Sequence, residues 1–229
     1  MSGPGPVTAE RARLLEAVAA RVPAGRGGAC TRVGVDGVDG AGKTVFAAEL
    51  ADTLRRQGRE VVQISLDDFH HVRAIRYRRG RTSPEGFWLD SFDYPRFAAE
   101  VLRPLGPGGS RRYRPRGHDL GTDRVLDGPF LTAGAGAVAV VDGLFLHRQE
   151  LAGLWDFTIF LEVPFTVTAA RMAQRDGSSP DPTHPSMARY VEAQRRYFSE
   201  CEPWAKAGLL VDNADVDRPA LRPSGCWPR

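Results

Sequence analysis

The stretch Gly37-Val38-Asp39-Gly40-Ala41-Gly42-Lys43-Thr44 decides how the rest of this sequence is interpreted. It fits the pattern G-x-x-x-x-G-K-[ST] at every fixed position. Glycines in such a loop let the backbone turn its N–H groups inward, toward the oxygens of a bound phosphate. Lys43 is long enough to reach the β- and γ-phosphates of a nucleotide, and Thr44 offers a hydroxyl to Mg²⁺. The stretch therefore predicts binding of a nucleoside triphosphate, with ATP expected.

The residues on either side have the secondary structure that such a loop requires. Thr31–Asp36 predicts a buried strand that runs directly into the loop. Val45–Gln57 predicts a helix, because Phe46, Leu50 and Leu54 recur every four residues. The N-terminus of that helix adds a partial positive charge facing the phosphates. This strand–loop–helix context argues against a chance glycine-rich turn.

Length and composition indicate one ordinary globular domain. The chain has 229 residues, of which 42% are hydrophobic and 26% charged, with a net charge of +3. We expect the core over about residues 28–213, a short helix before it and a flexible tail over residues 214–229. No run of like charges is long enough to suggest nucleic-acid binding, and no apolar run is long enough to cross a membrane.

The cysteines and the N-terminus indicate a cytoplasmic location. Met1–Val7 is rich in Gly and Pro and carries no charge, so we do not interpret it as a signal peptide. Cys30, Cys201 and Cys226 are odd in number and lack the spacing of a metal site. Without an export signal, reduced thiols in the cytoplasm are the simplest expectation. No His or Asn signature surrounds Cys201 to make it a nucleophile.

Strands alternate with helices along the whole chain. The expected strands are Thr31–Asp36, Glu60–Leu66, Ala137–Val141, Phe157–Val163 and Leu209–Asp212. The expected helices are Thr8–Val22, capped by Thr8, Val45–Gln57, Pro95–Leu102, Leu144–Leu154, Phe165–Asp176 and Ser186–Ala205. We expect residues 70–94 to form a loop with one short helix and residues 105–134 to hold two short extended pieces. This alternation is typical of an α/β fold with a mostly parallel sheet, here the three-layer P-loop NTPase fold with five strands and a lid.

Acidic residues follow two of these strands. Asp67 and Asp68 come after the second strand, and Asp142 after the third. Ligands of parallel sheets bind beyond the carboxyl ends of the strands, so these acids should lie near the glycine loop. Their other interpretation is that they close turns.

The rest of the sequence argues against two classes of nucleotide-binding protein, the GTPases and the motor-like ATPases. A GTPase usually reads guanine with an Asn-Lys-x-Asp segment, but the one asparagine of this chain, Asn213, precedes Ala214. Motor-like ATPases usually carry Asp-Glu after an apolar strand, whereas here Asp142 precedes Gly143. Two classes remain: a phosphotransferase acting on a small molecule, or a nucleotide-binding regulator.

At this point the motifs resemble those of the uridine kinase family of P-loop kinases, to which phosphoribulokinase and bacterial pantothenate kinase are related. The matching segments, in order, are Gly34–Thr44, Ser65–Phe69, Asp90–Pro95, Val140–Gly143, Arg171-x-x-x-Arg175-Asp176 and Val211–Asn213. They cover about residues 30–213. The resemblance implies an ATP-dependent small-molecule kinase that uses Mg²⁺.

The resemblance also implies roles in acceptor binding. Asp67 would be the general base on the acceptor hydroxyl, or Asp68 if the register is shifted by one. Asp93 would hold sugar hydroxyls, although a helix cap is an equal alternative. Tyr113 and His118 have the spacing of an aromatic and a histidine that contact the base, while the intervening residues differ from the family. His118 could equally be a loop histidine.

The resemblance also implies which residues bind the metal and which belong to a lid. Thr44 and Asp142 would hold Mg²⁺. Arg171 and Arg175 lie four apart, hence on one helix face, and would belong to a lid that stabilises the transferring phosphate. Their other interpretation is a solvated face with Asp176 as an ion-pair partner.

Three departures from the family concern the acceptor more than the chemistry. Family members commonly have Glu at Asp142 and an Arg-Gly pair where Gly177–Pro180 stands. Arg73–Trp88 is unusually rich in Arg and could bind an anionic acceptor or cover the surface. We expect the 5′-hydroxyl of a pyrimidine nucleoside as acceptor, with pantothenate, a sugar phosphate or a specialised metabolite as alternatives. Family members often associate, but no feature here decides the oligomeric state.

Overall fold

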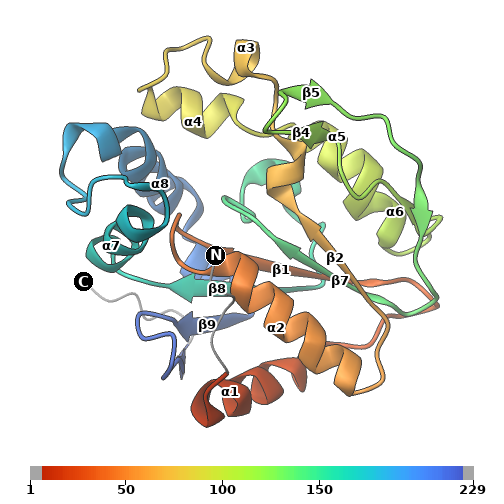
Figure 1. The fold of residues 1–229 in the computed structure, drawn as a ribbon. Coiled ribbons are helices and arrows are strands. Elements are labelled where there is room, and N and C mark those ends of the chain that lie inside the picture. Colours follow the sequence, from red (N-terminus) through yellow and green to blue (C-terminus); the bar gives the residue numbers. More distant parts are fainter. Residues whose placement is uncertain (1–6, 224–229) are drawn as a thin grey trace.

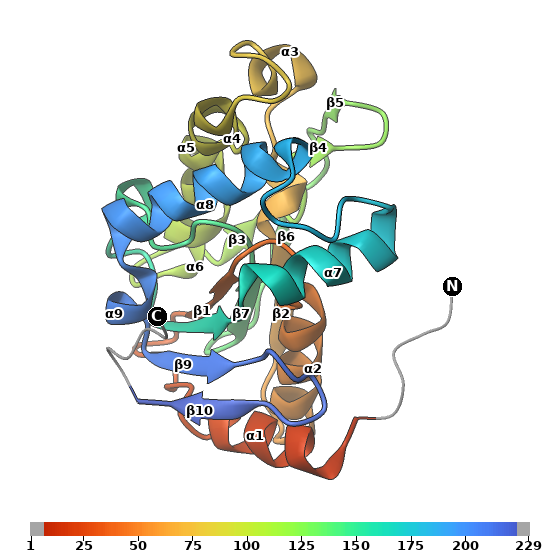
Figure 2. The same ribbon diagram turned by 90° about the vertical axis from the view of Figure 1, so that its left-hand side faces the viewer.

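The computed structural model describes residues 7–223. A six-stranded sheet of order β10-β9-β8-β1-β7-β2 forms its centre (Figure 1). Its strands are β1 Thr31–Gly37, β2 Val61–Ser65, β7 Val138–Asp142, β8 Phe157–Glu162, β9 Leu209–Asp212 and β10 Ala220–Arg222. All neighbouring strands pair in parallel except β9 and β10, which pair antiparallel at the edge seen in Figure 2.

Helices cover both faces of this sheet, giving three layers. The helices are α1 Ala9–Ala19, α2 Lys43–Arg56, α3 Arg73–Arg76, α4 Pro84–Asp90, α5 Tyr94–Phe97, α6 Arg103–Leu105, α7 Phe165–Asp176, α8 Ala188–Cys201 and α9 Pro203–Lys206. Leu14 of α1 and Leu50 of α2 pack on one face with Val33 of β1. Phe97 of α5 and Tyr197 of α8 belong to the apolar cluster of the other face. The α/β prediction is therefore confirmed.

The register of the central strands brings their carboxyl ends to one edge. Val35 of β1 lies opposite Asp142 of β7, and Ser65 of β2 lies opposite the same aspartate. The loop after β1 and the acids after β2 therefore emerge next to Asp142. Four short strands, β3 Arg112–Tyr113 with β6 Leu131–Thr132 and β4 His118–Asp119 with β5 Arg124–Val125, form two small ribbons away from this sheet.

Several predicted elements need correction. The helix predicted over Leu144–Leu154 is wrong: only Gln149–Leu151 forms a 3₁₀ turn, because Phe145 adopts φ 62°. The helix over Ser186–Ala205 is interrupted at Glu202, which has φ 43° and precedes a proline. Residues 70–94 hold two helices, α3 and α4, instead of one.

The C-terminal segment also differs from the expectation. We predicted five strands and a flexible tail over residues 214–229, yet Ala220–Arg222 pairs with β9 as the sixth strand. Arg222 also forms a 2.6 Å ion pair with Asp212, which fixes the new strand to its neighbour. Met1–Pro6 and residues 224–229, including Cys226, lie outside the described residues. Within residues 7–223, no helix has the length and apolar character needed to cross a membrane.

Candidate active site

The glycine loop connects β1 to α2 with a backbone that needs glycine at two positions. Gly40 has φ 77°, and a Cβ there would lie 2.7 Å from the carbonyl oxygen of Thr168. Gly42 caps α2 with φ 88°. The Lys43 ammonium donates a 2.8 Å hydrogen bond to the carbonyl of Val38, so the side chain folds back over the loop. This is the geometry of a phosphate-binding loop preceding a helix.

A cavity of about 400 Å³ opens over this loop. Most of the residues predicted for the donor side line it: Asp39, Gly40, Gly42, Lys43, Thr44, Asp67, Asp142, Arg171 and Arg175. They come from the ends of β1, β2 and β7 and from α7, and so from segments far apart in the sequence.

Thr44 and Asp142 meet at the floor of this cavity. The Thr44 hydroxyl donates a 2.7 Å hydrogen bond to Oδ2 of Asp142, and the Ser65 hydroxyl lies 3.3 Å from the same oxygen. Burial raises the pKa of Asp142, and the hydrogen bond from Thr44 opposes that rise. Mg²⁺ in phosphate-transfer sites takes one or two protein oxygens together with phosphate oxygens and water. These oxygen donors fit such an ion.

The two acids after β2 have different surroundings. Asp67 lines the cavity, and its carboxylate forms no hydrogen bond or ion pair with any residue in the described part of the chain. Burial by the surrounding protein raises the pKa of Asp67, and the positive charge of nearby Lys43 opposes that rise. Asp68 instead forms a 2.8 Å ion pair with Arg116. Of the two carboxylates, Asp67 is therefore the one available to a ligand.

The arginines of α7 both reach the cavity but differ in how they are held. Arg171 donates from Nη2 to the carbonyls of Asn213 and Ala214, at 2.9 and 2.8 Å. Its Nη1 is buried and has no hydrogen-bond partner among residues 7–223. The side chain of Arg175 is 60% exposed, pairs with Asp176 at 2.8 Å and lies 3.9 Å from Asp39. Arg171 is anchored to the backbone, whereas Arg175 is mostly exposed and is held by acidic side chains.

A second cavity of about 330 Å³ adjoins the loop on the side of α1, and we did not predict it from the sequence. Gly42 and Arg171 line both cavities. Asn213, which is fully buried, donates from Nδ2 to the carbonyl of Ala41 and accepts from Nη1 of Arg11 at 3.0 Å. The motif containing Asn213 was visible in the sequence, but nothing linked it to Arg11, 202 residues away.

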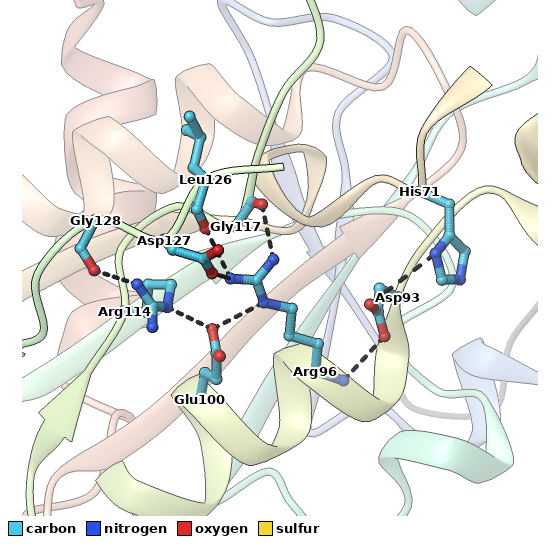
Figure 3. Close-up of polar contacts among 9 residues, drawn as sticks. All are labelled: His71, Asp93, Arg96, Glu100, Arg114, Gly117, Leu126, Asp127 and Gly128. Atoms are coloured by element: carbon cyan, nitrogen blue, oxygen red, sulfur yellow. Dashed lines mark hydrogen bonds and ion pairs between the residues drawn. The ribbon is translucent and has the colours of Figure 1, made fainter. Parts of the chain in front are cut away.

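A third cavity, of about 260 Å³, includes Asp93 and lies next to the segment after Asp67 and Asp68, because Phe69 and His70 line it. Asp93 caps α5, because its Oδ1 accepts from the Arg96 amide at 3.0 Å, while its Oδ2 lies 4.0 Å from Nδ1 of His71 (Figure 3). Both interpretations of Asp93 are thus compatible with its position. His70 also lines this cavity.

Tyr113 and His118 do not line any of these three cavities. Pairing of β3 with β6 turns Tyr113 into the core cluster that also contains Cys30, and burial raises the pKa of its phenol. His118 is 2% exposed and lies 3.3 Å from Asp123. Their spacing matched the resemblance, but this segment folds into two-stranded ribbons in which both side chains are buried outside the three cavities.

Behind the loop lies a buried polar network that the sequence did not reveal. Oδ1 of Asp36 accepts from the Gly37 amide at 2.7 Å, and its Oδ2 accepts from the Tyr197 hydroxyl and lies 2.7 Å from Nδ1 of His147. Gln194, one turn before Tyr197 on α8, accepts the Asp39 amide at 2.7 Å. This network holds the start of the glycine loop against α8.

The site and the six-stranded sheet define a P-loop nucleotide-binding fold. No protein-family model matches the chain. It is 29% identical over 189 residues to a thymidylate kinase from Bordetella petrii, an alignment covering 79% of this chain and 86% of that protein. It superposes with a TM-score of 0.68 on a possible uridine kinase from Bacillus stearothermophilus, at 24% identity, covering 87% of this chain and 96% of the other.

Phosphoribulokinase from Rhodobacter spheroides superposes with a TM-score of 0.54 at 18% identity, covering 80% of this chain and 70% of that one. At identities below 25%, these superpositions show that the fold is shared. The chain accordingly has the fold of the uridine kinase-like P-loop kinases, as the resemblance in its sequence implied.

Proposed function

We propose that this chain is an ATP-dependent kinase that transfers the γ-phosphoryl group to a hydroxyl of a small molecule. The observation that carries the proposal is the position of Asp67 in the same cavity as Lys43, Thr44 and Asp142. A protein that only binds a nucleotide needs the loop, but it does not need an unpaired carboxylate facing it. A phosphotransferase needs both.

The donor half of the site would work through positioning and charge. Backbone N–H groups of the loop and Lys43 would hold the phosphates. Thr44 and Asp142 would hold Mg²⁺, which supplies neutralisation of charge on the β- and γ-phosphates when bound. Arg175, which is mostly exposed, would close over the transferring group, while Arg171 would present its unpartnered Nη1.

The acceptor half depends on Asp67. Its carboxylate would accept a hydrogen bond from the acceptor hydroxyl and orient the oxygen toward the γ-phosphorus. As the new oxygen–phosphorus bond forms, the bond from the γ-phosphorus to the β–γ bridging oxygen breaks, the hydroxyl proton moves to Asp67 and ADP leaves. Burial raises the pKa of Asp67, and the positive charges of Lys43 and Arg175 near the phosphates oppose that rise.

The base of the nucleotide would bind in the second cavity. Gly42 and Arg171 belong to both the phosphate cavity and this one, so a bound nucleotide could extend from one into the other. Asn213 and Arg11 supply polar groups, and Val45 and Val216 supply apolar ones. This arrangement suits a flat, polar-edged base.

For the acceptor we propose the 5′-hydroxyl of a pyrimidine nucleoside, uridine or cytidine. The family resemblance supports this choice, as does the position of Asp93 in the cavity lined by His70, which contacts the backbone carbonyl of Asp67. The similar proteins whose names refer to uridine and thymidylate agree with a pyrimidine. Pantothenate, a sugar phosphate and a specialised metabolite remain the alternatives.

An acceptor panel tests the proposal. ADP release would be measured with ATP, Mg²⁺ and each of uridine, cytidine, thymidine 5′-monophosphate, pantothenate and ribulose 5-phosphate. We expect turnover of uridine or cytidine. Turnover of another member alone would keep the kinase and replace the acceptor. ATP binding with no ADP release above the acceptor-free rate would favour a nucleotide-binding regulator.

A further inference from the structure

The 260 Å³ cavity is lined by His70, a histidine that the sequence did not single out and that contacts the backbone carbonyl of Asp67. We propose that His70 is a specificity-determining residue whose Nε2 accepts a hydrogen bond from a hydroxyl or amine of an uncharged phosphate acceptor. This inference rests on the proposed kinase function, because it assigns the acceptor to this cavity. It goes further by stating which chemical groups the cavity selects and which it rejects.

The hydrogen bonding of His70 fixes which ring nitrogen carries the proton. Nδ1 lies 2.8 Å from the backbone carbonyl oxygen of Asp67. A carbonyl oxygen only accepts, so Nδ1 must be the protonated nitrogen and Nε2 carries the lone pair. Within residues 7–223, Nε2 makes no hydrogen bond, although the ring lines the cavity. The same bond ties the ring to the backbone of the residue we propose as the base.

Packing holds this ring in place and keeps it neutral. His70 pairs through its backbone with Phe92, and the two rings lie 4.3 Å apart between centroids. Burial lowers the pKa of His70 to about 4, with smaller contributions from Arg76 and His118, so the imidazole is uncharged at neutral pH. A neutral imidazole whose Nδ1 already donates to the Asp67 carbonyl can only accept a hydrogen bond from a ligand, through Nε2.

The second polar group of this cavity is also an acceptor. Asp93 uses Oδ1 to cap α5, which leaves Oδ2 for the cavity. Nδ1 of His71, which also lines the cavity, lies 4.0 Å from Oδ2. His70 and Asp93 together favour a ligand that brings hydrogen-bond donors.

The cationic charge around the cavity is already used by the protein. Arg96 is the one arginine among the lining residues. Its guanidinium donates to Glu100 and to the carbonyl of Gly117, both at 3.0 Å, and to the carbonyl of Leu126 and to Asp127 at 2.7 and 3.0 Å (Figure 3). Four of its five N–H donors are thus committed.

Arginines of the segment before α4 also form ion pairs within the protein. Arg76 pairs with Asp123 at 3.2 Å, and Arg79 pairs with the buried Asp90 at 3.1 Å. A phosphate or carboxylate on the acceptor would therefore meet Asp93 and the lone pair of His70, while the guanidinium groups of Arg76, Arg79 and Arg96 are already paired with acidic residues. Of the two roles considered for Arg73–Trp88, the structural one accounts for these contacts.

The mouth of the cavity adds an apolar requirement. Ile75 and Val125 line it and are 36% and 55% exposed. Phe69 and Val72 continue the apolar wall inward. An uncharged acceptor with hydroxyls at one end and an apolar or aromatic face at the other matches both the polar and the apolar parts.

The test compares two substitutions and two matched acceptors. His70→Phe keeps a ring against Phe92 but removes the acceptor atom, whereas His70→Gln restores an oxygen near the position of Nε2. Uridine and uridine 3′-monophosphate share the same 5′-hydroxyl and differ by one phosphate. If the panel identifies a different acceptor, panthenol and pantothenate form the equivalent pair, differing by one carboxylate.

We expect His70→Phe to raise the acceptor KM about tenfold without changing the KM for ATP, and His70→Gln to recover most of that loss. We expect kcat/KM of the native chain to favour the uncharged acceptor by at least roughly 10²-fold. An unchanged acceptor KM in His70→Phe, or equal use of the phosphorylated acceptor, would overturn this inference and leave the kinase function standing. ATP binding without transfer to any acceptor would overturn the kinase function, and the role of His70 with it.

Discussion

The hydroxyl of Thr44, at the start of α2, lies 2.7 Å from Oδ2 of Asp142, at the end of β7. The two residues are 98 positions apart in the sequence, and they meet because β1 and β7 are parallel neighbours. Ser65, at the end of β2, reaches the same carboxylate oxygen. Two strand ends and the start of α2 thus supply oxygen atoms to one point beside the glycine loop.

The first prediction concerns this group of oxygens. Thr44→Val removes the hydroxyl with little change in shape and should raise the Mg²⁺ concentration needed for half-maximal activity by about tenfold or more. Thr44→Ser, the matched control, keeps the hydroxyl and should stay within a few-fold of the native chain. Initial rates across a Mg²⁺ titration at saturating ATP measure the effect. Equal Mg²⁺ dependence in both variants would exclude Thr44 from the metal site.

A second prediction follows from the raised pKa of Asp67. Because folding raises this pKa, ionisation of Asp67 is harder in the folded than in the unfolded chain. Its contribution to stability is therefore fully present below the ordinary aspartate pKa of about 3.9 and is lost as pH rises through the folded value. At pH 7, Asp67→Asn should unfold at a higher temperature than the native chain, and the difference should shrink toward pH 4.

The raised pKa of Asp67 should also set the pH dependence of the reaction rate. The rate should fall on the acid side with a midpoint above the ordinary aspartate value, since the protonated carboxyl cannot accept the hydroxyl proton. Thermal unfolding and kcat/KM measured over the same buffers provide both readouts. An Asp67→Asn variant less stable than the native chain at pH 7 would contradict the raised pKa.

The third prediction separates the two arginines of α7. Arg175→Ala should lower kcat by roughly 10²-fold with little change in melting temperature, because its partners are exposed charges. Arg171→Ala should lower both, because Arg171 binds the carbonyls of Asn213 and Ala214. Kinetics and calorimetry on both variants check this. A large loss of stability in Arg175→Ala would show that it is structural.

The fourth prediction concerns Arg96, whose guanidinium binds Gly117, Leu126 and Asp127. Arg96→Ala should cost about 3 kcal/mol in the free energy of unfolding and raise the acceptor KM, leaving the KM for ATP unchanged. Arg116→Ala is the control, because Arg116 is half-exposed and its one ion pair is with Asp68. Denaturant unfolding would contradict the anchoring role if both variants lost the same stability.

These contacts also show how far the sequence could predict the structure. The donor side was predictable because parallel strands bring their carboxyl ends together, which predicts that Thr44, Asp67 and Asp142 lie at one edge of the sheet. Periodicity likewise identified α7 at its observed bounds. In these segments the secondary structure follows from the local sequence.

The acceptor side was not predictable in this way. Tyr113 had the right spacing, but its direction depends on the pairing of β3 with β6, two residues long on each side. The segment between them is held by Arg96, which no local pattern connects to Gly117 or Leu126. The partners Asp36, His147 and Tyr197 are likewise joined only by the fold, and so were missed.

The central claim is that Asp67, and not its neighbour, is the base. Asp67→Asn and Asp68→Asn should be compared for ATP binding by calorimetry and for kcat with the acceptor that the panel identifies. We predict that ATP affinity stays within a few-fold of the native value in both variants. Asp67→Asn should lose roughly 10²–10⁴-fold in kcat, while Asp68→Asn, which breaks only the pair with Arg116, keeps most of it. Undiminished turnover by Asp67→Asn would contradict the mechanism and place the base elsewhere.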